Sequence, residues 1–142
     1  MHNPLPKPVK EHGQSLVELA LSLMFLLILL GGIVDLGRAF FTYMALRDAV
    51  QEGALYGSIN PTLTVEIKDH VINSGNIVPD ILSSGDITVS VLGSPCTGNS
   101  IRIQAVYNDF PITMPFIGTL IGRQTVPIRA SITDTILSPA CP

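Results

Sequence analysis

Residues 13–34 read GQSLVELALSLMFLLILLGGIV, and this almost entirely apolar stretch is the dominant feature of the chain. No charge occurs from Leu19 to Val34, so Glu18 is the only ionisable side chain inside the apolar block. A carboxylate costs on the order of 2.5–3.5 kcal/mol at the centre of a bilayer and less near its edge. Glu18 is therefore a candidate functional residue, and it requires a group that neutralises it.

The apolar segment Leu16–Val34 is long enough to cross a membrane. Its 19 residues form a helix of roughly 28 Å, which is close to the thickness of a hydrocarbon core. A cleaved secretory signal has a shorter apolar region and a small-x-small site after it, and residues 33–38 do not supply that site. A buried core helix is disfavoured, because the segment is apolar on every face and the chain is short. We therefore predict a transmembrane helix.

Charge distribution alone does not orient this helix. Lys7 and Lys10 precede it, and Arg38 and Arg47 follow it, so the positive-inside rule finds two basic residues on each side. Asp35 lies three residues before Arg38 and is predicted to pair with it on one helix face, which weakens Arg38 as an orienting charge. We expect the N-terminus inside and the C-terminus outside.

The two cysteines, Cys96 and Cys141, both follow the apolar segment. If their side of the membrane is extracytoplasmic, a disulfide is allowed, and it would contribute roughly 4 kcal/mol in the chain-entropy model. The alternative is a pair of free thiols in a reducing compartment. The cysteines favour an extracytoplasmic C-terminal domain.

The helical pattern continues beyond the membrane segment. Small and apolar residues recur every three or four positions from Ala39 to Gly57, which predicts one long helix ended by Asn60-Pro61. Gly53 and Gly57 form a Gly-x-x-x-Gly pair past the bilayer, and we interpret it as packing against the domain.

The remaining sequence predicts a small mixed domain. Residues 62–74 have the pattern of a short second helix, and a loop is expected after it. Residues 87–91, 101–107 and 126–132 alternate with period two, which indicates half-buried strands. Pro127 suggests that the third strand begins late or lies at an edge. The apolar loop 111–118 is either a covering loop or a partner-binding tip. The predicted fold is α+β: a long N-terminal helix packed against a short helix and a small antiparallel sheet of about three strands.

Composition excludes several functions. The net charge is −3 and there is no Trp, which argues against nucleic-acid binding. No Cys/His cluster has metal-ligand spacing, and Asp69-His70 is better explained as a solvated helix face. We predict no catalytic residue, no cofactor and no metal site, so an enzyme is not expected.

Three segments together resemble a known family. They are Gly13–Glu18, Asp35–Phe40 and Ala45–Gly57, and they are similar to the TadE-like family of pilin-like proteins in the tight-adherence (Tad/Flp) type IV pilus machinery. One departure is Asp35, where Glu is more usual.

The resemblance implies cleavage by a prepilin peptidase between Gly13 and Gln14, and a role as a minor pilin or pseudopilin. It implies three parts: a leader (1–13), a long helix (14–58) whose first half is in the membrane, and an extracytoplasmic domain (59–142). The implied partners are the cytoplasmic membrane, the peptidase, and other pilin-like subunits or copies of this chain. The implied locations are the cell membrane, as a single-pass protein, and, after assembly, an extracellular pilus.

The chemistry of the residues supports a role for Glu18 in assembly, through pairing with the new N-terminal amine. Cleavage would give residue 14 a free ammonium group one helical turn from Glu18, and each charge would offset the desolvation of the other. The alternative is an uncleaved, permanently anchored surface-binding or adhesin module, in which Glu18 reaches the headgroups.

Overall fold

The computed structural model describes residues 13–75, 78–114, 118–119 and 122–141. Apart from Gly13, the predicted leader lies outside the described residues. The elements follow in the order α1 (Gln14–Ile59), α2 (Thr64–Asn73), α3 (Val78–Ile81), η1 (Ser84–Asp86), β1 (Ile87–Leu92), β2 (Ser100–Pro111) and β3 (Thr125–Thr135). The predicted α+β arrangement is confirmed.

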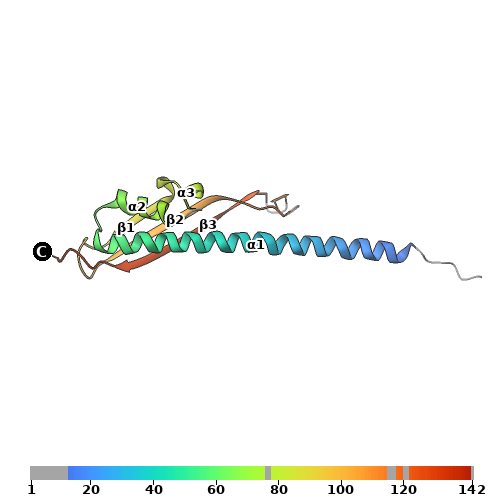
Figure 1. Ribbon diagram of the computed structural model, residues 1–142, viewed down its shortest axis with the longest axis horizontal. Coiled ribbons are helices and arrows are strands. Elements are labelled where there is room, and N and C mark those ends of the chain that lie inside the picture. The colour runs from blue at the N-terminus through green and yellow to red at the C-terminus, as the bar shows by residue number, and fades with distance from the viewer. Residues whose placement is uncertain (1–12, 76–77, 115–117, 120–121, 142) are drawn as a thin grey trace, which may run out of the picture.

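Helix α1 is the axis of the molecule. It runs for 46 residues, and the backbone N–H of Asn60 closes its last turn on the Tyr56 carbonyl at 3.1 Å. Figure 1 shows the other elements gathered along its C-terminal half, while most of the N-terminal half extends beyond them. Its buried residues all fall between Leu46 and Ser58. The domain therefore covers only one half of its own helix.

The three strands form an antiparallel sheet in the order β1-β2-β3. Val89 and Ile132 flank Ile103 in the register, so the predicted alternation places one face of each strand toward the helix. A β-bulge interrupts the β2–β3 pairing between Tyr107 and Phe110. Pro127 lies within β3, which is an edge strand, so its missing N–H removes no bond from the middle of the sheet.

The core lies between this sheet, the C-terminal half of α1, and α2. Gly53 and Gly57 allow the close approach, because a Cβ on Gly53 would lie 2.3 Å from Val71 Cγ2 and one on Gly57 would lie 2.9 Å from Ile101 Cδ1. The Gly-x-x-x-Gly pair therefore packs inside the domain, as predicted from its position. The larger apolar side chains that are fully buried among the described residues are Leu46, Val50, Ile67, Val71, Val78, Ile87, Ile101, Ile103 and Ile136.

The segment after α2 was expected to be a loop, and this was incomplete. It contains the short helix α3 and the 3-10 turn η1. Ser83 caps the start of η1, and its backbone N–H and hydroxyl both donate to Asp86 Oδ2, at 2.9 and 2.6 Å. Local side chain-to-backbone bonds of this kind stabilise a turn without any apolar periodicity, and so the pattern did not predict it.

Candidate membrane-anchoring and assembly site

The N-terminal half of α1 presents apolar side chains in all directions. Within the described residues, α1 is the one helix that is long and apolar enough to cross a membrane, and none of its most apolar window is buried. Phe25, for example, is 74% exposed. Contact of such a surface with lipid hydrocarbon carries no free-energy penalty, whereas its exposure to water costs free energy. The helix therefore indicates single-pass membrane anchoring.

The predicted processing site lies at the beginning of this helix. Gly13 immediately precedes Gln14, the first helical residue, and a Cβ placed on Gly13 would meet no atom within 4 Å. The backbone N–H of Val17 donates to the Gly13 carbonyl at 3.3 Å. Glu18 is exposed one turn beyond Gln14. Within the part of the chain that the structure describes, Glu18 has no ion-pair partner.

Asp35 lies at the far end of the apolar segment and binds residues 112–114, which begin the β2–β3 connection and are here called the β2–β3 tip. Its carboxylate accepts hydrogen bonds from the backbone N–H of Thr113 at 2.9 Å and of Met114 at 2.7 Å. The Thr113 hydroxyl also donates to it. Arg38 Nη1 lies 3.4 Å from the same carboxylate, so the predicted pair forms, but the loop supplies the closer partners.

Arg38 joins the same cluster. Its Nη1 donates to Thr113 Oγ1 at 3.0 Å, and its guanidinium carbon lies 5.4 Å from the centre of the Phe110 ring. This is within the range of a cation–π contact. Asp35 and Arg38 together therefore fasten α1 to the end of β2 at the boundary of the apolar segment. Sequence reasoning found the two charges but not Thr113, which is 78 residues away from Asp35 along the chain.

Residues 13–55 match the model of the TadE-like protein family. The resemblance is thereby confirmed over this segment, which begins at Gly13 and includes Glu18, Asp35 and Arg38. It ends within α1, so α2 and the sheet lie outside the match. No curated protein and no solved structure matches the chain. Over these residues, which are less than half of the chain, the protein is similar to TadE-like proteins.

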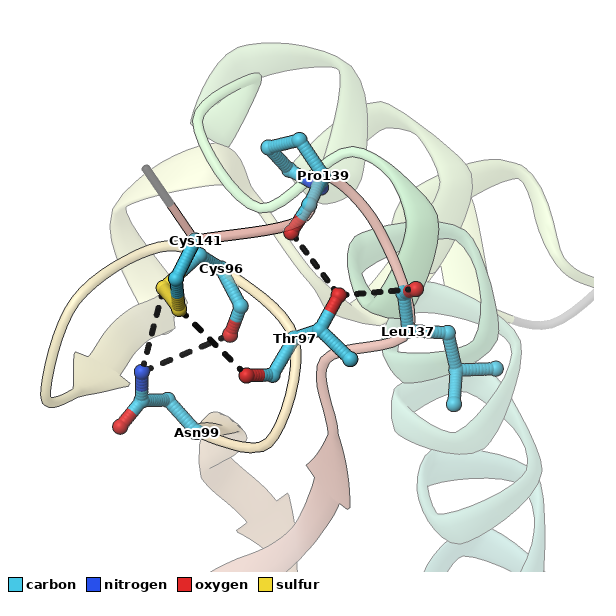
Figure 2. Close-up of a disulfide and its surroundings, with 6 residues drawn as sticks. All are labelled: Cys96, Thr97, Asn99, Leu137, Pro139 and Cys141. Carbon is cyan, nitrogen blue, oxygen red and sulfur yellow. Dashed lines mark hydrogen bonds between the residues drawn. A yellow bond between two sulfur atoms is a disulfide. The ribbon is translucent and has the colours of Figure 1, made fainter.

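The end of the domain farthest from the TadE-like apolar segment is closed by a disulfide. Cys96 and Cys141 are joined, with their Cα atoms 5.0 Å apart. Figure 2 shows the bond beside Thr97, which reaches across to the C-terminal tail. The Thr97 backbone N–H and hydroxyl both donate to the Pro139 carbonyl, at 2.8 and 2.9 Å. The tail is fixed to α1 as well, because the Leu137 N–H donates to the Ser58 carbonyl at 2.8 Å.

The domain beyond the TadE-like segment does not assemble a metal centre from the residues that the structure describes. His70 stacks on Tyr56, with ring centroids 4.0 Å apart. Asp69 and His70 are both exposed, as expected for a solvated helix face, and the His70 ring also packs α2 onto α1. Its neighbour Asp69 accepts, through its backbone carbonyl, a bond from the Asn73 side chain at 2.8 Å. These contacts are structural.

Proposed function

We propose that this protein is a structural pilin-like subunit, a minor pilin or pseudopilin, of a Tad-type pilus. It is processed by a prepilin peptidase between Gly13 and Gln14 and assembles through the apolar half of α1. The observation that carries the proposal is that an uncovered apolar helix begins at Gln14, within a segment that matches the TadE-like family from Gly13 onward. Its role is structural and not catalytic.

Processing creates the group that Glu18 requires. Hydrolysis of the Gly13–Gln14 peptide bond frees the α-amino group of Gln14, one helical turn from the Glu18 carboxylate. The amine of the same chain or of a neighbouring subunit then forms an ion pair with Glu18, and this reduces the cost of placing either charge in an apolar environment. Gly13 suits the cut because it has no side chain and its surroundings are open.

Exposed apolar side chains continue past the predicted membrane boundary. Leu36 is 73% exposed and Phe41 is 72% exposed, although both follow the uncharged stretch. Single exposed apolar residues are normal, but these two lie on α1 beyond the predicted membrane span, where lipid hydrocarbon does not cover them. We assign Leu36 and Phe41 to contacts with other pilin-like subunits. The C-terminal domain is extracytoplasmic in this arrangement.

Site-specific crosslinking tests the assembly role. A photoreactive residue in place of Phe41, in cells with the complete pilus machinery, should give a ladder of crosslinked pilin-like subunits. The ladder should disappear in cells that lack the prepilin peptidase. If only monomer is captured while pili form normally, the chain is a solitary anchor and the adhesin-type alternative replaces the proposal.

The role of Glu18 is tested separately. Glu18→Ala should insert into the membrane but assemble poorly, because the new amine then lacks its counter-charge. Ser22 lies one turn further along the same helix. Because Ser22→Ala removes no charge, this variant should assemble normally. Normal assembly of Glu18→Ala would remove the proposed function of the carboxylate.

A further inference from the structure

The β2–β3 tip lies beside the apolar half of α1. Asp35 binds the backbone of Thr113 and Met114, and from there the Met114 side chain extends toward the N-terminal half of the helix. A Cβ on Gly32 would lie 2.6 Å from Met114 Cε, and one on Gly31 would lie 3.7 Å from Met114 Cγ. The two glycines therefore leave the space that the methionine occupies.

This contact lies inside the predicted membrane span. Gly32 precedes Asp35 by three residues, or about 4.5 Å along the helix axis, and it belongs to the uncharged stretch that ends at Val34. Met114 also borders an open groove on α1 whose other walls are nearly all apolar. The residues of that groove on α1 are Ser22, Phe25, Leu26, Ile28 and Leu29.

We propose that the β2–β3 tip is a membrane-contacting element, and that Met114 lies among the acyl chains of the leaflet nearest the C-terminal domain. The occupant of the groove is lipid hydrocarbon, because the groove continues directly into the surface that crosses the bilayer. Phe25 and Leu26, which line it, are 74% and 62% exposed. The inference rests on membrane anchoring alone and does not require the pilus function.

The polar contacts at the tip suit this depth. Transfer of a backbone N–H group out of water without a hydrogen-bond acceptor costs several kcal/mol. The Asp35 carboxylate accepts hydrogen bonds from the N–H groups of Thr113 and Met114, so these two donors are paired at the boundary. Arg38 and Phe110 lie on the domain side of this point, where a cation and an aromatic ring face the headgroups. The tip thus sets how far α1 enters the bilayer.

Tryptophan fluorescence tests the depth directly, because the chain contains no Trp. Three single-tryptophan variants of the full chain, Met114→Trp, Phe25→Trp and Leu92→Trp, would be reconstituted in phosphatidylcholine vesicles with and without brominated acyl chains. Phe25 lies in the middle of the span, and Leu92 ends β1 at the far end of the sheet, 46% exposed. We expect blue-shifted emission and loss of fluorescence in brominated lipid for Met114→Trp and Phe25→Trp, but not for Leu92→Trp.

Two outcomes would overturn the proposal. If Met114→Trp responds to aqueous iodide like Leu92→Trp, the tip lies in water. If neither iodide nor brominated lipid affects it, protein covers the groove, as a second copy would. Should the larger ring displace the tip, Ile112→Trp keeps Met114 in place. Its emission should be quenched by bromines near the headgroup end of the chains, and a lack of such quenching counts against the proposal equally.

Discussion

The two halves of α1 are equally helical but are covered in opposite ways. From Leu46 to Ser58 the buried residues recur every three or four positions, and the glycines Gly53 and Gly57 face α2 and the sheet. From Leu16 to Val34 apolar residues occupy every face and the domain covers none of the most apolar window. A helix that is apolar on one face buries that face against its own domain, whereas a helix that is apolar on every face requires lipid or another protein to cover it. The predictions below test this contrast.

The largest expected effect comes from truncating one leucine in each half. Leu46 is fully buried, so Leu46→Ala should lower the free energy of unfolding of the domain by about 2–5 kcal/mol. Leu26 is 62% exposed, and Leu26→Ala should leave the domain's unfolding unchanged. Urea unfolding in detergent, followed by circular dichroism, measures both. Equal losses for the two variants would mean that the apolar half also supports the domain.

The disulfide should stabilise only the covered half. It closes a loop of 45 residues, and the paired Cys96→Ser and Cys141→Ser substitution should lower the free energy of unfolding by roughly 2–4 kcal/mol. Membrane insertion should not change, because both cysteines lie at the opposite end of the domain from the apolar segment. The same unfolding assay, together with membrane fractionation, checks this. An unaltered urea midpoint would show that the hydrogen bonds of the tail suffice without the bond.

Glycines in the same helix should respond differently to alanine. Gly53→Ala places a Cβ against the stiff side chain of Val71, and overpacking of this kind costs about 1–3 kcal/mol. Gly37 has no atom within 4 Å of such a Cβ, so Gly37→Ala should be neutral or stabilise the helix by up to about 1 kcal/mol. Thermal unfolding of the two variants compares them. A stable Gly53→Ala would mean that the α1–α2 contact is looser than the structure indicates.

The smallest effect concerns Asp86, at the entry to β1. The Ser83 hydroxyl and backbone N–H donate to its carboxylate and hold the pKa of Asp86 below the ordinary value of 3.8. A carboxylate whose pKa is lowered in the folded state stabilises the fold at pH values above 3.8. This contribution is lost as the pH falls through the folded-state pKa. The stability difference between the native chain and Asp86→Asn should therefore be constant near neutral pH and shrink below 3.8. A difference that does not change on acidification would contradict this assignment.

Periodicity predicted most of this fold, because helices and strands bury one face with a fixed repeat. The three alternating runs became β1, β2 and β3, and the recurring small residues of α1 became its buried face. The 3-10 turn Ser84–Asp86 was not predicted, since local hydrogen bonds stabilise it and no apolar pattern accompanies them. The Asp35–Thr113 contact was not predicted either. It joins residues far apart in the chain, and it depends on where the sheet places its tip.

The residues of the candidate site were predicted from the positions of charged residues in the sequence more than from apolar periodicity. Glu18 and Asp35 stood out because they interrupt or end an uncharged block, which made them visible without a structure. The structure adds that Asp35 is satisfied within the chain. Among the described residues, it gives Glu18 no ion-pair partner.

The most direct test of this account is the mass of the N-terminal peptide of protein isolated from assembled pili or from the native membrane. Intact-mass and peptide mass spectrometry should place the first residue at Gln14, with residues 1–13 removed and a free α-amine available to Glu18. Functional protein that still begins at Met1 would contradict the account, because the carboxylate of Glu18 would then have no amine to neutralise it.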